Sequence, residues 1–227
     1  MPPLPTPVLN PTQPYWLKAF PGASKPAPPR PASASNGARR PSLPPVADVV
    51  IIGGGISGVS AAYHLRKLRP DLQVVLLEAR QLSHGATGRN GGLLWPALNA
   101  PWCRTVARYG ASETGRMMAF EQRCLAELVG CIRGAGLAEE VRWAPFSEGG
   151  LHVCESEEEM ELQLRELRTM QEFGFLTDAH PLSRRQTSAL LGCDTYRGGA
   201  VRQPGVSRVW AARLVAALAR LAAAEGG

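Results

Sequence analysis

The sequence predicts an α/β fold that begins with a parallel sheet, and three observations lead to this prediction. Residues 49–52 are an apolar, β-branched run without polar alternation, which is typical of a parallel strand buried on both faces. Glycines follow at once in the spacing G-x-G-x-x-G, and an apolar-striped segment up to Arg69 predicts a helix. Residues 74–77 form a second apolar run that ends on Glu78. This order of strand, turn, helix and strand predicts a dinucleotide-binding unit.

The glycines of this motif have separate physical roles. Gly53 allows the tight turn out of the strand, Gly55 lets a pyrophosphate approach the backbone, and Gly58 lets the helix pack close to the sheet. Ile56 and Ser57 belong to the same site, because the start of the helix directs N–H groups and a partial positive charge at the phosphates.

Glu78 and the loop after it complete the candidate site. Glu78 stands 25 residues after Gly53, near the ~20 expected for the acid that binds ribose hydroxyls, and an acid there favours FAD or NAD over NADP. Residues 85–92 read Gly-Ala-Thr-Gly-Arg-Asn-Gly-Gly, a loop at the strand end where such sheets bind ligands. Arg89 offers a phosphate fork, and Asn90 offers both a donor and an acceptor. A flexible surface loop with an incidental arginine is the alternative.

Residues 48–92 resemble the FAD-dependent oxidoreductases of the D-amino-acid oxidase superfamily, which includes sarcosine, glycine and γ-glutamylputrescine oxidases. In that family a Gly-Ala-Ser/Thr-Gly-Arg-Asn-Gly-Gly loop lies along the pyrophosphate and reaches the isoalloxazine ring. The resemblance implies an α/β fold with a FAD-binding Rossmann-like domain of the GR2 type and part of an α+β substrate domain. The residues that would bind the cofactor are Gly53, Gly55, Ile56, Ser57, Gly58, Glu78, Ala79, Arg80, Thr87, Arg89, Asn90, Gly91 and Gly92.

The resemblance also implies a chemistry. A member of the family oxidises the C–N bond of a small-molecule amine or amino acid, passes a hydride to flavin N5 and usually returns the electrons to molecular oxygen. Relatives with covalent flavin often carry a histidine near the position of Arg89, so we expect non-covalent FAD here. A looser likeness covers residues 205–221. The resemblance names no catalytic base in this chain.

Two rival functions remain open, and two others are disfavoured. An NAD-dependent dehydrogenase would share residues 48–78 but would not need the loop 85–92, and a non-catalytic nucleotide-binding fragment is the second rival. A serine hydrolase is disfavoured because Val59 stands where G-x-S-x-G needs a glycine. A P-loop is absent from the sequence. His152 is interpreted as a packing residue, and the glutamates at 157–161 as acids that complement a helix dipole.

Composition limits the partners and the compartment. The net charge is +6, but residues 1–47 hold five basic residues and no acid, so the remainder carries only +1 and no basic face for nucleic acid is indicated. The five scattered cysteines form no C-x-x-C pair, so no metal site is expected. They favour a reducing, cytoplasmic setting, or an organelle if the acid-free lead is a transit peptide. The sequence contains no run of ~18 apolar residues, so no membrane span is predicted.

The sequence also suggests an order of domains. Residues 1–46 hold 14 of the 20 prolines and form a lead, in which Tyr15 and Trp16 are interpreted as an anchor on the folded body. Residues 47–100 are the FAD-binding unit, 101–203 a helical insertion with part of the substrate domain, and 204–227 a return helix. Because family members continue further, we expect an N-terminal portion that lacks the C-terminal half, binds FAD weakly and does not turn over an amine.

The segment 101–203 has a pattern of its own. A helical stripe from residue 112 to 134 includes Met117 and Phe120, which are expected in a core. Residues 141–146 and 150–154 are predicted as two strands with a turn between them. Ser156 is expected to open a helix through a capping box, and a further helix and a strand are predicted at 183–191 and 195–203.

Overall fold

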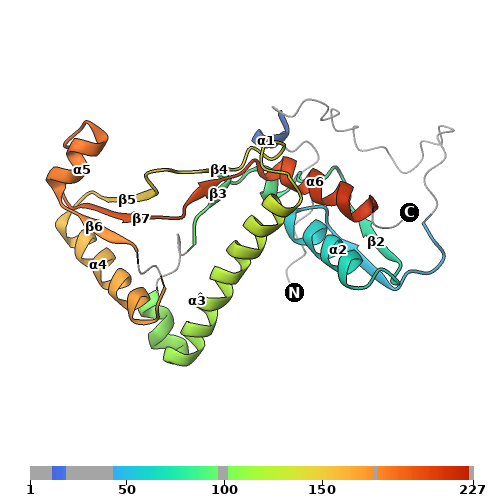
Figure 1. Cartoon of the computed structure of the whole chain (residues 1–227), viewed down its shortest axis with the longest axis horizontal. Coiled ribbons are helices and arrows are strands. Elements are labelled where there is room, and N and C mark those ends of the chain that lie inside the picture. The colour runs from blue at the N-terminus through green and yellow to red at the C-terminus, as the bar shows by residue number, and fades with distance from the viewer. Residues whose placement is uncertain (1–11, 19–42, 97–101, 176–177, 225–227) are drawn as a thin grey trace, which may run out of the picture. The chain divides into compact units, whose positions relative to one another are not determined.

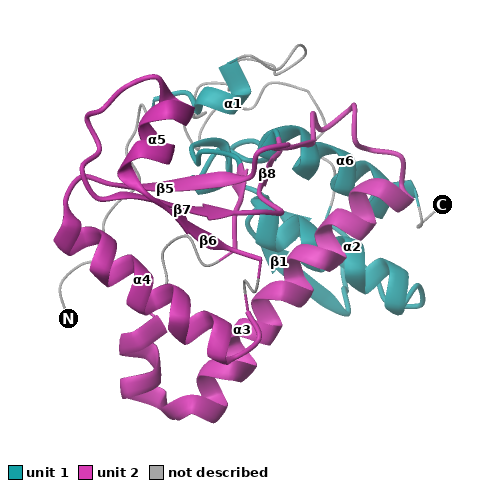
Figure 2. Ribbon diagram, turned by 60° about the vertical axis from the view of Figure 1, so that its left-hand side comes forward, with its two compact units in different colours: residues 1–92, 210–227 teal, residues 93–209 magenta. Residues whose placement is uncertain are grey.

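The computed structural model describes residues 12–18, 43–96, 102–175 and 178–224. Two compact units are present, and they are coloured separately in Figure 2. Unit 1 comprises residues 1–92 and 210–227, and unit 2 comprises residues 93–209. The proline-rich lead lies mostly outside the described residues, apart from residues 12–18 and its last few positions.

Unit 1 begins with the predicted parallel pair. Strands β1 (Val49–Ile52) and β2 (Val74–Leu77) lie in parallel, with Val49 opposite Val74 and Ile52 opposite Leu77. Helix α2 (Ile56–Leu68) connects them, as a right-handed βαβ unit requires, and it packs on both strands (Figure 1). The parallel sheet expected at the start of the fold is confirmed.

The burial of β1 differs from the prediction of a strand covered on both faces. Val50 and Ile52 are 53% and 87% exposed, while Ile51 lies on the α2 side, close to Gly58. Side chains alternate across a strand, so one face of β1 meets α2 and the other is uncovered by the described residues. The apolar run alone could not distinguish a strand with two covered faces from a strand with one.

Helix α6 (Ala211–Ala224) joins unit 1 from the far end of the chain. Its alanines favour helix strongly and leave room for close packing, and α6 lies against α2. The buried side chains of α6 include Leu214, Val215 and Leu218. The short helices α1 (Tyr15–Lys18) and η1 (Ala86–Gly88) contact its beginning.

The described residues of unit 2 form two small antiparallel sheets and three helices. Strands β3 (Leu93–Leu94), β8 (Ser207–Arg208) and β4 (Ala144–Pro145) form one sheet in that order. Strands β5 (Gly150–Cys154), β7 (Gly199–Gln203) and β6 (His180–Leu182) form the other. The expected turn at residues 147–149 therefore does not pair its two flanking strands with each other, because β4 pairs with β8 and β5 with β7.

Two expectations about the first helix of unit 2 differ from the structure. Helix α3 (Trp102–Gly134) is broken at Gly110, which has φ 81°; the part after the break agrees with the predicted helix at 112–134, and the part before it was not predicted. Met117 and Phe120 are 40% and 62% exposed, while Met118 is buried with Trp102, Met170 and Phe175. Cys124, the next position of the stripe, is also exposed, so the assignment of the stripe to a core was wrong at its first three positions.

The remaining two helices start as their sequences predicted. In α4 (Glu157–Glu172) the Ser156 hydroxyl accepts a bond from the Glu159 N–H. The expected capping box is not completed, because the Glu159 carboxylate accepts a bond from the Glu155 N–H instead of the Ser156 N–H. In α5 (Arg184–Leu191) Ser183 and Gln186 form a complete capping box. Within the described residues, no helix has the length and apolar character to cross a membrane, and no cluster of three or more metal-binding side chains occurs.

Candidate functional site

The turn after β1 has the geometry that its glycines predict. Gly53 has φ +110°, a conformation that L side chains rarely adopt, and open space lies beside it. A Cβ on Gly58 would lie 2.0 Å from the Gly53 carbonyl oxygen and 3.3 Å from Ile51 Cγ2. The first and third glycines therefore let α2 start directly against the turn and the strand.

Glu78 occupies the end of β2 and faces this turn. Its two carboxylate oxygens accept bonds from the backbone N–H of Gly54, at 2.7 Å, and of Arg80, at 2.9 Å. An ionised carboxylate offers about four acceptor positions, so about two remain for further donors such as ribose hydroxyls. Gly54 is itself confined, because a Cβ there would lie 2.5 Å from Leu82 Cδ2. The carboxylate is thus held in place by the backbone and still has acceptor capacity.

The start of α2 meets the loop 85–92. The Thr87 hydroxyl accepts a bond from the Ile56 N–H at 3.0 Å, and Thr87 is buried. Gly55, the residue before the helix, supplies no side-chain cap. One N–H of the first turn of α2, that of Ile56, is therefore bonded to the loop. The other N–H groups at a helix N-terminus have no partner within the helix, and such groups suit an anion.

The end of the loop is ordered by a local turn and by the N-terminal segment. The Asn90 side chain accepts a bond from the Gly92 N–H at 2.9 Å, and Gly92 has φ 70°, which favours glycine. The Arg89 guanidinium donates to the hydroxyl and the carbonyl of Thr12. Two of the donors on Arg89 are therefore directed at the protein itself, and its predicted contact with a phosphate stays a prediction.

The structure thus brings most of the predicted residues into one region of unit 1. Glu78 contacts the Gly53–Gly55 turn, Ala79 and Arg80 follow it in the chain, and Thr87 contacts the helix start at Ile56. Ser57 and Gly58 lie in the first turn of α2. Arg89, Asn90 and Gly91 are exposed, whereas Gly92 is buried and donates its N–H to the Asn90 side chain. Their individual roles toward a cofactor stay predictions.

Three polar residues between Glu78 and this loop were not singled out by sequence reasoning. Ser83 and His84 are 1% and 3% exposed, and neither the Ser83 hydroxyl nor either ring nitrogen of His84 has a hydrogen-bond partner within the described residues. The buried side-chain amide nitrogen of Gln81 is also unsatisfied there. Buried polar atoms normally have partners, so this cluster suits a site that a polar ligand or ordered water completes.

The environment of His84 disfavours the protonated form of its ring. Burial is the main cause that lowers the pKa of His84, and the positive charges of Arg80 and Arg89 lower that pKa further, against a smaller opposite effect of Glu78. Ser83 also has a positive φ of 63°, which is uncommon outside glycine. The lowered pKa of His84 and the positive φ of Ser83 are features that periodicity and spacing do not reveal.

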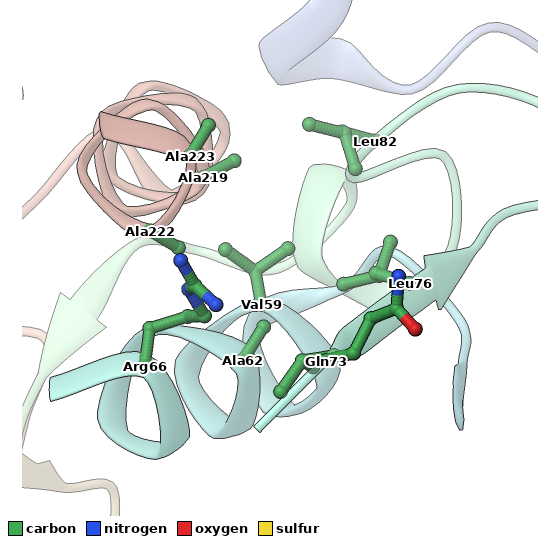
Figure 3. A pocket seen from close by; sticks show the side chains of 10 residues that line it. Val59, Ala62, Arg66, Gln73, Leu76, Leu82, Ala219, Ala222 and Ala223 are labelled. Carbon is green, nitrogen blue, oxygen red and sulfur yellow. The ribbon is translucent and has the colours of Figure 1, made fainter. Parts of the chain in front are cut away.

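A separate apolar pocket of about 440 Å³ lies on the helix side of unit 1. Figure 3 shows its lining between α2, β2 and α6, with Val59 and Ala62 on α2 and Arg66 and Gln73 as the polar groups near it. None of Gly53, Gly55 and Gly58 lines this pocket. It is therefore distinct from the region where Glu78 meets the glycine turn.

The fold and the site have the features of a Rossmann-like unit: a parallel β1–α2–β2 unit with a G-x-G-x-x-G turn, a fixed acid at the end of β2 and a glycine-rich loop against the start of α2. A family model described as "DAO: FAD dependent oxidoreductase" matches residues 48–227. The chain belongs to this family of FAD-dependent oxidoreductases.

Individual relatives agree with this family. The chain is 30% identical to "Probable oxidoreductase OrdL" of Rhizobium meliloti over 180 residues, which are 79% of this chain and 40% of that protein. It is 41% identical to γ-glutamylputrescine oxidoreductase of Escherichia coli over 71 residues, 31% of this chain and 16% of that protein. A crystal structure of glycine oxidase from Bacillus cereus is similar with a TM-score of 0.56 and 25% identity, over 80% of this chain and 45% of that chain. The chain therefore spans less than half the length of these relatives.

Proposed function

We propose that the protein of which this chain forms at least a part is a FAD-dependent oxidoreductase that acts on the C–N bond of a small amine or amino acid. The observation that carries the proposal is the Glu78 carboxylate, held at the end of β2 by the N–H groups of Gly54 and Arg80 with acceptor capacity left for a ribose. Membership of the FAD-dependent family supports FAD over NAD. Family relatives named as glycine oxidase and γ-glutamylputrescine oxidoreductase support the substrate class.

In this proposal the chain's own residues bind and orient the cofactor. Glu78 holds the adenosine ribose, and the N-terminus of α2 after Gly55 faces the pyrophosphate, where N–H groups and the helix dipole favour negative charge. The loop ending at Gly91 and Gly92 leads toward the flavin ring. Because Arg89 stands near the position where relatives with covalent flavin often carry a histidine, FAD is proposed to be held non-covalently. When bound, the flavin accepts the hydride from the substrate carbon that carries the nitrogen, and molecular oxygen is the proposed final acceptor.

The first test is the visible absorbance of the purified protein. Bound flavin gives a yellow protein, whereas NAD absorbs no visible light. A colourless protein that binds NAD and not FAD would instead favour an NAD-dependent dehydrogenase. A protein that retains flavin but oxidises no amine, even when expressed with any coding sequence that follows residue 227, would favour the non-catalytic alternative.

The second test replaces Glu78 by alanine. Loss of bonds from ribose hydroxyls to a charged acceptor should cost roughly 1.5–3 kcal/mol of FAD binding, about 10- to 150-fold in the dissociation constant. Because Glu78 also supports the turn, a matched control is needed at the opposite end of the strand pair. There the Asp48 carboxylate accepts a bond from the Gln73 N–H at 2.7 Å.

Asp48→Ala removes a similar carboxylate-to-backbone bond far from the strand ends that bind ligands. Asp48→Ala should lower the stability of unit 1 but leave the affinity for FAD near that of the parent chain. Equal losses of FAD affinity in Glu78→Ala and Asp48→Ala would show that Glu78 acts only through stability. Unchanged FAD affinity in a folded Glu78→Ala protein would refute the assignment of Glu78 to the ribose.

A further inference from the structure

A segment that precedes the nucleotide-binding unit packs on the loop of that unit. We call Thr12–Lys18 the N-terminal strap. Within it Pro14 and Leu17 are buried, and Leu17 shares a hydrophobic cluster with Trp210 and Ala212 at the beginning of α6. The Trp210 indole N–H donates to the Trp16 carbonyl at 3.0 Å, and the two indole rings lie 5.5 Å apart between centroids. The strap is thus fixed to the beginning of α6 by apolar packing and a hydrogen bond. Figure 1 shows α1, which belongs to the strap, beside the start of α6.

From this position the strap contacts three consecutive residues of the loop. The Trp16 indole N–H donates to the Asn90 carbonyl at 2.7 Å. The Arg89 guanidinium donates to the Thr12 hydroxyl at 2.8 Å and to the Thr12 carbonyl. A Cβ on Gly88 would lie 2.7 Å from Pro14 Cβ, so the strap lies directly against the Gly88 backbone.

The other side of the loop is tied to the start of α2, where Thr87 accepts the Ile56 N–H. Residues 87–90 are therefore held between the helix that faces the proposed pyrophosphate and a segment more than 30 residues before β1 in the chain. A loop that is already ordered binds its ligand more tightly, because the ordering cost is met before binding.

We propose that the N-terminal strap is a positioning element that holds the loop 87–92 in its cofactor-binding conformation. The proposal rests on the proposed function for the part that concerns FAD. It also gives Arg89 a different role from the predicted phosphate fork: Arg89 is a positioning residue, which connects the loop to Thr12. The strap acts on the cofactor only through the loop.

Hydrogen exchange on the full chain, without added FAD, tests the positioning by itself. The N–H groups of Gly88, Arg89 and Asn90 donate to carbonyls within the loop, at 3.2, 3.0 and 3.0 Å, so their exchange reports whether the loop keeps its fold. Deletion of residues 2–18 removes the strap, and deletion of residues 2–11 is the matched control that keeps it. Removal of the strap should raise the exchange rates of these three amides by at least about tenfold over the control.

Two further measurements separate positioning from a general loss of stability. The amides that pair β5 with β7 belong to unit 2 and should exchange at the same rate in both deletions. A synthetic peptide of residues 10–20, added to the strap-deleted chain, should restore slow exchange of the loop. If the loop amides exchange at equal rates in the two deletions, the proposal is overturned. It is also overturned if loss of the strap raises the exchange rates equally throughout unit 1 and the peptide does not reverse this.

If the chain without the strap does not fold, a point variant decides. Trp16→Phe keeps an aromatic ring against Trp210 but removes the donor to Asn90, whereas Tyr15→Phe changes a neighbouring ring that is 68% exposed. Trp16→Phe should raise the exchange rates of the loop amides about threefold or more, and Tyr15→Phe should not. Equal rates in both variants overturn the proposal.

Titration with FAD then tests the role of Arg89. Arg89→Lys should weaken FAD in the parent chain, because lysine cannot make both bonds to Thr12. In the strap-deleted chain, where FAD should bind about ten- to a hundredfold more weakly, the same substitution should cause no further loss. A further loss there would place Arg89 on the phosphate and overturn its positioning role. If the parent chain binds no FAD, the proposed function fails, while the exchange experiment still decides the role of the strap.

Discussion

Gly58→Ala is a sensitive test of how the glycine turn is built. The new Cβ would lie 2.0 Å from the Gly53 carbonyl oxygen, against the 3.0 Å below which Cβ contacts are essentially not seen. The turn and α2 must therefore separate by about 1 Å, and the blocking atom is backbone that cannot rotate away. Overpacking of this kind costs about 1–3 kcal/mol, and we expect the upper end because the same shift pulls α2 away from Ile51.

The measurement is the free energy of unfolding in urea, followed by far-UV circular dichroism. Gly130→Ala is the matched control, because Gly130 is exposed within α3 and a Cβ there meets nothing within 4 Å. The control should gain about 0.5–1 kcal/mol from the higher helix propensity of alanine. The same substitution should thus change stability in opposite directions at the two sites. A Gly58→Ala chain within about 0.5 kcal/mol of the parent would refute the close approach.

Two further predictions concern titratable groups. Because burial, together with the charges of nearby arginines, lowers the pKa of His84 below its ordinary 6.5, the unfolded chain binds the proton first and stability falls as the pH drops below about 6.5. His84→Gln should remove up to about 1.4 kcal/mol of the stability difference between about pH 7.5 and about pH 5.5 in urea titrations, and an unchanged difference would contradict the lowered pKa of His84. Burial, with a smaller contribution from Glu159, raises the pKa of the Cys154 thiol to about 11. Only about 0.1% of Cys154 is therefore thiolate near pH 8, so iodoacetamide should label the exposed Cys124 and Cys193 well before Cys154. Comparable labelling rates at the three cysteines, followed by mass spectrometry, would argue against the burial of Cys154.

Local patterns predicted the parts of the fold that depend on neighbours in sequence. The strand at 49–52, the glycine turn and the strand ending at Glu78 were predictable because each glycine and the final acid have a physical requirement at that spacing. The capping residue Ser156 marked a helix start for the same reason, since a hydroxyl satisfies an orphan N–H of the first turn.

Features set by distant packing could not be predicted in this way. Nothing in the apolar run 49–52 reveals that Val50 and Ile52 face away from the helices, because exposure depends on which elements lie above the sheet. Likewise, the pairing of β4 with β8 is decided by residues 62 to 64 positions away. The contacts of Arg89 and Trp16 were also hidden, because long polar side chains reach partners across 74 to 77 residues of sequence.

Unit 1 is built from the two ends of the sequence, residues 1–92 and 210–227, and this has a consequence for how the protein folds. Residues of β5 and β7 that pair with each other are 45 to 53 positions apart, whereas Trp16 and Trp210 are 194 positions apart. The entropic cost of closing a loop grows with its length, so contacts within unit 2 can form at lower cost, and the folded unit 2 then shortens the loop that unit 1 must close. During synthesis the apolar face of α2 leaves the ribosome long before α6, which packs against it. Until α6 has emerged up to residue 224, the surface of α2 that packs against α6 remains exposed to water or is bound by a chaperone.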